Sequence, residues 1–153
     1  MLTHATVIDV TGGPGKADYT IVISGDRIVD MGKGAELRVP QGSQVVDATG
    51  KFLIPGLWDM HVHLEDQKEY LPLFIANGVT GVRVMWGFPF HHEWRRAIEA
   101  GQMLGPRMLI ASAIVDGPVP FWPQSVSVAS EAQARQAVIK AKPKLSGILD
   151  RGF

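Results

Sequence analysis

The sequence of 153 residues contains no cysteine. This absence excludes disulfide bonds and thiolate metal sites, so any metal ion would have to be held by His, Asp, Glu or a modified Lys. No apolar run approaches the roughly 20 residues that span a bilayer. The start of the chain, Met1-Leu2-Thr3-His4, also lacks the basic segment and apolar stretch of a signal peptide. We therefore expect a cytoplasmic protein with no membrane partner.

The sequence also has no excess of charge of either sign. Its 15 Lys and Arg residues balance 15 Asp and Glu residues. A chain without a basic surplus has no electrostatic reason to bind nucleic acid or an anionic membrane. Hydrophobic residues make up 46% of the chain, enough for a buried core. Composition thus indicates an ordinary globular protein with no nucleic-acid partner.

One short stretch carries the strongest chemical signal. After an apolar run and a Pro-Gly break, Asp59, His61 and His63 occupy alternate positions in residues of strand character. A strand sends alternate side chains to opposite faces, which predicts these three on one face. The other face would carry Trp58, Met60, Val62 and Leu64.

Two imidazoles on one strand face can converge on one divalent ion, for which zinc is the natural candidate. A His-x-His pair by itself also occurs on a solvated strand face, or as histidines that are hydrogen-bonded in a core. The apolar strand and the Pro-Gly entry favour the metal interpretation, so His61 and His63 are the predicted metal ligands.

The surrounding sequence resembles a known family. Residues 47–63 resemble the entry to the first barrel strand of the amidohydrolase superfamily of metal-dependent hydrolases. Upstream, residues 5–9 and 23–32 resemble the N-terminal β-segments of that family. Downstream, residues 76–83 and 105–107 resemble its second and third barrel strands, most nearly those of imidazolonepropionase-like and prolidase-like members.

The resemblance implies an α/β fold with a (β/α)8 TIM-like barrel preceded by a small β-sandwich. We expect the sandwich domain in residues 1–54 and the start of the barrel in residues 55–153. A complete barrel takes about 250 residues. The chain therefore has room for a partial barrel of about three βα units, and we expect it to be the N-terminal fragment of a longer enzyme.

Turn residues and periodicity predict the individual elements. In the first domain we expect strands at residues 2–10, 19–24, 27–31, 45–47 and 52–54, with a tight turn at Gly25-Asp26. In the second we expect helices at residues 68–76, 92–100 and 130–142, and strands at residues 79–86 and 107–113 after the strand that carries the histidines. The order of these elements indicates right-handed parallel βαβ units.

Two loops follow the second and third predicted barrel strands, at residues 86–92 and 115–123, and both are rich in aromatic residues and proline. They would form the walls of an apolar pocket, or else pack against one another and cap the barrel. His91 and His92 are adjacent, near a helix start, and would point apart. We therefore do not expect them to be ligands.

The resemblance implies hydrolysis of a carbon–nitrogen bond in a small amide-type substrate through a metal-activated water, with one or two divalent ions, zinc being the expected one. It also implies a lysine on a fourth strand, histidines on a fifth and sixth, and an aspartate base on an eighth. None of Lys140, Lys142 and Lys144 aligns with that lysine.

Two hypotheses follow. In the first, the chain is part of a metal-dependent amidohydrolase whose activity needs the complete barrel, so that this chain alone is inactive. In the second, it is a non-catalytic half-barrel that self-associates through an unpaired strand edge and an apolar face. Both are compatible with a homo-oligomer.

Overall fold

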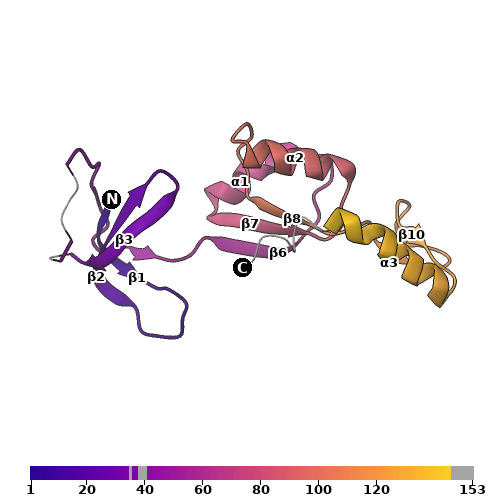
Figure 1. The fold of residues 1–153 in the computed structure, drawn as a ribbon, viewed down its shortest axis with the longest axis horizontal. Coiled ribbons are helices and arrows are strands. Elements are labelled where there is room, and N and C mark those ends of the chain that lie inside the picture. The colour runs from indigo at the N-terminus through magenta and orange to yellow at the C-terminus, as the bar shows by residue number, and fades with distance from the viewer. Residues whose placement is uncertain (35, 38–40, 146–153) are drawn as a thin grey trace. The chain divides into compact units, whose positions relative to one another are not determined.

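The computed structural model describes residues 1–34, 36–37 and 41–145, with side chains up to Ala141 (Figure 1). The chain divides into two compact units, Met1–Pro55 and Gly56–Phe153, and each is described by itself. Residues 146–153 lie outside the described residues. So do the side chains of Lys142 and Lys144, two of the lysines that do not align with the fourth-strand lysine of the family.

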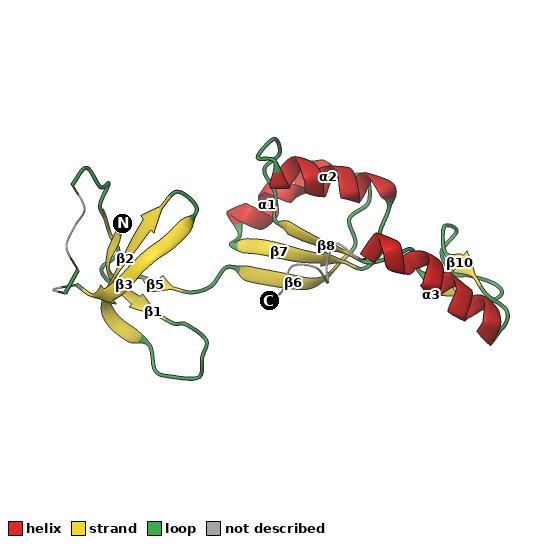
Figure 2. Cartoon of the chain, in the orientation of Figure 1, coloured by secondary structure: helices red, strands yellow, loops and turns green. Residues whose placement is uncertain are grey.

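The first unit is a five-stranded sheet. It contains β1 (Leu2–Val7), β2 (Lys16–Ser24), β3 (Arg27–Lys33), β4 (Val46–Asp47) and β5 (Phe52–Leu53), in the order β3-β2-β1-β4 with β5 also paired to β1. Its small core consists of Ala5, Val7, Ile21 and Ala48. The described strands of this unit form a single sheet (Figure 2), so the β-sandwich remains a prediction.

The strand boundaries in this unit have local causes. Gly25 has a φ of 59° and turns the chain between β2 and β3, as predicted. β1 ends at Val7 and not at residue 10, because Val10 has a φ of 54°, which a strand residue does not adopt. β2 begins at Lys16, earlier than predicted. Lys16 pairs with Val7 across the sheet, and its ammonium lies 2.7 Å from the Asp9 carboxylate.

The second unit begins with three parallel strands, β6 (Leu57–Val62), β7 (Val79–Val84) and β8 (Arg107–Ile110), which are adjacent in that order. A 3-10 turn (Lys68–Tyr70) and α1 (Leu71–Ala76) connect β6 to β7, and α2 (Pro89–Glu99) connects β7 to β8. The two helices cover one face of the sheet (Figure 1), with α1 on β7 and α2 on β8. The predicted parallel βαβ order is thus present, while a closed barrel remains a prediction.

The core of this unit lies between the sheet and the two helices. Val82, Val84, Met108 and Ile110 face the helices from β7 and β8. They pack with Val62 at the end of β6, with Leu64 two residues beyond it, and with Leu71 and Trp94 from the helices. On β6, by contrast, Leu57, Trp58 and Met60 are 40% to 49% exposed. The helix-facing side is therefore the packed side of the sheet.

Helix ends follow the expected local signals, with one exception. α1 ends at Ala76 with Asn77 as its C-cap, and Gly78 adopts a φ of 76°, as the Asn-Gly pair predicts. α2 begins at Pro89, three residues before the predicted start. Proline suits the first turn of a helix because its φ is already helical and its missing N–H would be unpaired there.

The segment after β8 forms the short parallel pair β9 (Val115–Asp116) and β10 (Val126–Ser127), which the sequence did not predict, and then α3 (Glu131–Leu145). At the start of α3 the Gln133 N–H donates to Ser130 Oγ (3.3 Å), as expected for a capping box. Gln133 Oε1 accepts from the N–H of Ala129 (2.6 Å) and not from that of Ser130. None of the described helices combines the length and apolar character that crossing a lipid bilayer requires.

Candidate metal centre

His61 and His63 lie at the carboxyl end of β6. The intervening Val62 and the following Leu64 are buried against the helices, so alternation directs both histidines to the opposite face of the sheet, where both are exposed. Their ring centroids are 5.1 Å apart, and the two Nε2 atoms are separated by 3.1 Å. Each imidazole therefore points its own Nε2 atom toward the Nε2 atom of the other.

This separation fits shared ligation of a metal ion. Two nitrogens at about 2.0–2.1 Å from one tetrahedral zinc ion lie roughly 3.4 Å apart. The observed 3.1 Å also fits an N–H···N hydrogen bond between two neutral rings. Among the described residues, no three His, Asp or Glu side chains lie close enough together to hold a metal ion. The described part of the chain thus offers a pair of ligands and no third.

Asp59 does not join the two imidazoles. Its Oδ1 atom accepts a hydrogen bond from the His61 backbone N–H (3.1 Å), which is a local turn of the chain. The pairing of β6 with β7 shifts register between Asp59 and Val62, and such a bulge interrupts the alternation of side chains. The Asp59 carboxylate therefore stabilises the backbone just before the two histidines and does not act as a third ligand beside them.

The bulge also corrects the predicted faces of β6. A Cβ atom at Gly81 would overlap the indole of Trp58, so this indole lies on the Gly81 side of the sheet. Val82 is the next residue along β7 and points the other way, into the core with Val62. Trp58 and Val62 thus lie on opposite faces, whereas strict alternation placed them on the same face.

Arg83 on β7 supports the bulged segment from the adjacent strand. Its Nε–H donates to the backbone carbonyl of Met60 at 2.8 Å. Met60 lies inside the interval where the register shifts, and there the regular ladder is interrupted. A hydrogen bond from a charged donor is stronger than a neutral one, so Arg83 stabilises the backbone immediately before His61.

His91 is a buried, fully hydrogen-bonded histidine. Its Nδ1 atom faces the backbone N–H of Phe88 (3.1 Å), and its Nε2 atom faces the carbonyl of Leu64 (2.6 Å). An N–H needs an acceptor and a carbonyl needs a donor, so Nδ1 is unprotonated and Nε2 carries the hydrogen. Burial holds the pKa of His91 below its ordinary range, which keeps the ring neutral. The interpretation that His91 is not a ligand therefore agrees with its surroundings.

The sequence did not reveal this role, although a signal for it exists. Phe88 is the N-cap of α2, so His91 is at the third helical position, where Glu or Gln usually accepts from the N-cap N–H. A proline at residue 89 marks the first helical position. Read together, these positions identify His91 as a helix-capping side chain.

The aromatic residues of the two loops pack against one another. The ring of Trp86 lies 4.9 Å from that of Phe88 and 5.6 Å from that of Trp122, between centroids. Phe88 and Phe90 are stacked at 5.3 Å. The loop after β7 and the loop between β9 and β10 are therefore in contact through Trp86 and Trp122. A substrate pocket along this wall stays a prediction.

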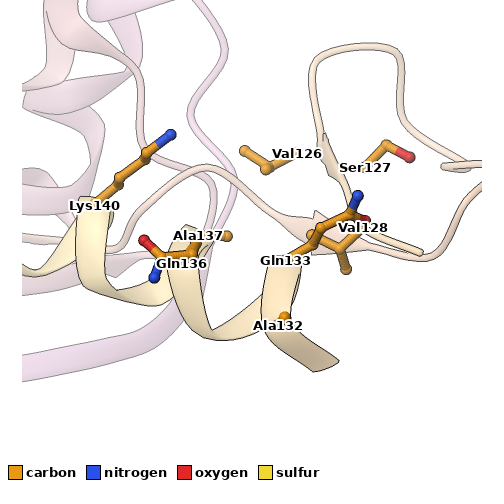
Figure 3. A pocket seen from close by; sticks show the side chains of 8 residues that line it. All are labelled: Val126, Ser127, Val128, Ala132, Gln133, Gln136, Ala137 and Lys140. Atoms are coloured by element: carbon orange, nitrogen blue, oxygen red, sulfur yellow. The ribbon is translucent and has the colours of Figure 1, made fainter. Parts of the chain in front are cut away.

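A separate hollow of about 330 Å³ lies between β10 and α3 (Figure 3). The labelled side chains that line it are Val126, Ser127, Val128, Ala132, Gln133, Gln136, Ala137 and Lys140. None of these is a histidine or a carboxylate. Its one ionisable side chain is that of Lys140, so the hollow adds no histidine or carboxylate ligand to His61 and His63.

Comparisons with known proteins cover nearly the whole chain. No family model matches it. Adenine deaminase 2 of Agrobacterium fabrum is 29% identical over 185 aligned positions, which cover 100% of this chain and 29% of that protein. Dihydroorotase of Geotalea daltonii is 50% identical over 46 positions, or 30% of this chain and 10% of the relative. The chain thus spans less than a third of the length of these relatives.

A solved structure shows the same arrangement of elements. A candidate prolidase from Bifidobacterium longum superposes with a TM-score of 0.74 and 28% identity, over 93% of this chain and 37% of that one. The fold described above is therefore shared with a longer protein of related sequence.

Proposed function

This chain belongs to the amidohydrolase superfamily, and on that premise we propose that it supplies the first metal-binding strand of a metal-dependent hydrolase acting on carbon–nitrogen bonds. The observation that carries the proposal is the convergence of His61 Nε2 and His63 Nε2 to 3.1 Å. They stand at the carboxyl end of a parallel strand, the end at which TIM-barrel enzymes build their active sites.

His61 and His63 would hold a divalent ion, zinc first among the candidates, through neutral imidazole nitrogens. When bound, such an ion supplies a Lewis acid and lowers the pKa of a coordinated water to about 7. Asp59 and Arg83 fix the backbone on the approach to the two rings by their hydrogen bonds to the His61 N–H and the Met60 carbonyl. Whether one or two ions are used depends on ligands beyond this pair.

Small amide-type molecules are the proposed substrates. Adenine and dihydroorotate, the compounds in the names of two relatives, are both small nitrogen heterocycles. The joined aromatic loops, with Trp86 and Trp122 in contact, would provide an apolar wall at the same edge of the sheet. The described residues offer two ligands and no assigned base, so we expect little or no turnover from the 153-residue chain by itself.

Elemental analysis of the purified chain tests this proposal. We expect near-stoichiometric zinc in the wild-type chain at dialysis equilibrium with zinc, and its loss in the His61→Ala, His63→Ala double variant. His4→Ala is the matched control, because His4 is an exposed histidine in the first unit, paired with Asp18. Zinc retained by the double variant, or absent from the wild-type chain, would contradict the proposal.

A second candidate function is a half-barrel that self-associates without catalysis, in the cytoplasm. It is favoured by the exposure of Leu57, Trp58 and Met60, since β6 is an edge strand of the sheet. Sedimentation velocity over a range of concentrations tests it. We expect a reversible dimer or larger species that Met60→Lys shifts toward monomer, and a strictly monomeric wild-type chain would contradict it.

A further inference from the structure

We propose that His91 is a positioning residue for the two metal-binding histidines. Its imidazole ties the backbone just after His63 to the start of α2. The inference rests on the proposed metal site, because it assigns His91 a role in holding that site in shape. It goes beyond that site by proposing that the metal affinity of His61 and His63 also depends on His91, which is not a ligand.

The tether acts where the strand no longer holds the chain. β6 ends at Val62, whose carbonyl accepts from the Met85 N–H (2.9 Å). His63 and Leu64 lie beyond this last strand residue. The Leu64 carbonyl accepts from His91 Nε2 at 2.6 Å, and the Leu64 side chain is buried in the core. The backbone on the carboxyl side of His63 is therefore fixed through His91.

The other side of the imidazole is equally well fixed. Nδ1 accepts from the Phe88 N–H at 3.1 Å, so the ring is held at the first turn of α2. The rings of Phe90 and Trp94 flank it, with centroids at 4.4 Å and 5.1 Å. A ring with both nitrogens bonded and two aromatic neighbours has one orientation. It can therefore transmit the position of α2 to residue 64.

Loss of this tether should loosen His63 relative to His61 and separate their Nε2 atoms. A site with only two described ligands has little other means of holding its geometry, so metal affinity should fall. A second-shell hydrogen bond to a metal ligand commonly changes affinity by about 10- to 100-fold. His91 acts one residue further out, through the backbone, and a tenfold loss is the expected scale.

The test measures zinc affinity by competition with a chromophoric chelator, on the 153-residue chain and three variants at a temperature where all are folded. His91→Leu removes both hydrogen bonds. His91→Gln keeps both, because its amide oxygen can accept from Phe88 and its amide nitrogen can donate to Leu64. Ile98→Ala is the control, since it removes an apolar side chain that packs against the same core from the same helix and leaves the His91 ring and both of its hydrogen bonds in place.

We expect His91→Leu to weaken zinc binding about tenfold, and His91→Gln and Ile98→Ala to stay within threefold of the wild-type chain. An affinity of His91→Leu within threefold of wild type would overturn the inference. So would an equal loss in Ile98→Ala, since the effect would then come from general loosening of the core. If His91→Leu does not fold, His91→Glu at pH 8 replaces it, because a carboxylate can cap α2 but cannot donate to Leu64.

A second measurement without metal separates this inference from the proposed function. Nitrogen-15 NMR of the histidine rings should show His91 as the neutral tautomer with hydrogen on Nε2. In His91→Leu, the amide signals of His63 and Leu64 should change more than in Ile98→Ala. If the wild-type chain binds no zinc, the proposed function fails, and unchanged His63 and Leu64 signals would then overturn the tether independently.

Discussion

The indole of Trp58 occupies the space on β7 that a side chain at residue 81 would need. A Cβ atom built on Gly81 would overlap the ring, and the two residues are paired across β6 and β7. Glycine is required here because of a close approach of another side chain and not because of its backbone angles. The same contact fixes which face Trp58 uses, next to the bulge that precedes the histidines.

Gly81→Ala should therefore lower the free energy of unfolding by about 1–3 kcal/mol, the usual cost of overpacking. Urea denaturation followed by circular dichroism measures the change. Gly117→Ala is the matched control, because nothing lies within 4 Å of its added Cβ, and it should change stability by less than about 0.5 kcal/mol. In a Trp58→Ala background the cost of Gly81→Ala should largely vanish, and strictly additive effects would contradict the contact.

His91 should make the second unit less stable in mild acid. Burial is the main cause that holds the pKa of His91 below its ordinary value of 6.5; the Leu64 hydrogen bond opposes this shift, and the coulombic interaction with His92 adds to it. The unfolded chain then binds the proton first as pH falls, so stability is complete above about 6.5 and declines below it.

Urea denaturation at pH 7.5, 6.0 and 5.0, for the wild-type chain and His91→Gln, isolates this contribution. The difference in unfolding free energy between the two proteins should shift in favour of the glutamine variant as pH falls. A pH-independent difference would show that His91 does not titrate differently in the folded and unfolded chain.

Asp116 should order the aromatic loop after β8. Its carboxylate accepts from the N–H of Gly117 (2.7 Å) and of Phe121 (2.9 Å), and these bonds hold its pKa below the ordinary value, the one from Phe121 foremost. Asp116→Ala removes both acceptors. We expect amide hydrogen exchange at Gly117 and Phe121 to become at least about tenfold faster, with little change in global stability.

Asp116→Asn is the control for this loop, because its amide oxygen can still accept one of the two bonds. It should give an intermediate exchange rate at these amides. Exchange that is unchanged in Asp116→Ala would mean that the loop is held by other contacts, such as the ring of Trp122 against Trp86.

The sequence predicted the elements whose signals are local. Asn77-Gly78 marks the end of α1, and Gly25-Asp26 marks the turn between β2 and β3. Both glycines have a positive φ, which few other residues adopt, so the glycine itself signals the turn. The alternation of His61 and His63 about Val62 predicted that the two rings share a face, and their Nε2 atoms do converge. That they bind a metal ion is still a prediction.

The parts that the sequence did not predict depend on contacts between distant residues. The bulge in β6 follows from its pairing with β7 and from Arg83, 23 residues away from Met60, so simple alternation misplaced Trp58. The role of His91 depends on Leu64, 27 residues earlier, and only the packed structure brings the two together. The pair β9 and β10 is too short for periodicity to detect.

The central claim is that His61 and His63 bind one divalent ion together through Nε2. Nitrogen-15 NMR of the histidine rings during a zinc titration of the 153-residue chain tests it most directly. We predict that the Nε2 signals of both residues shift in parallel and saturate at one zinc ion per pair of histidines, while those of His4 and His91 stay in place. A shift of only one of the two rings, binding through Nδ1, or no shift at all would contradict the claim.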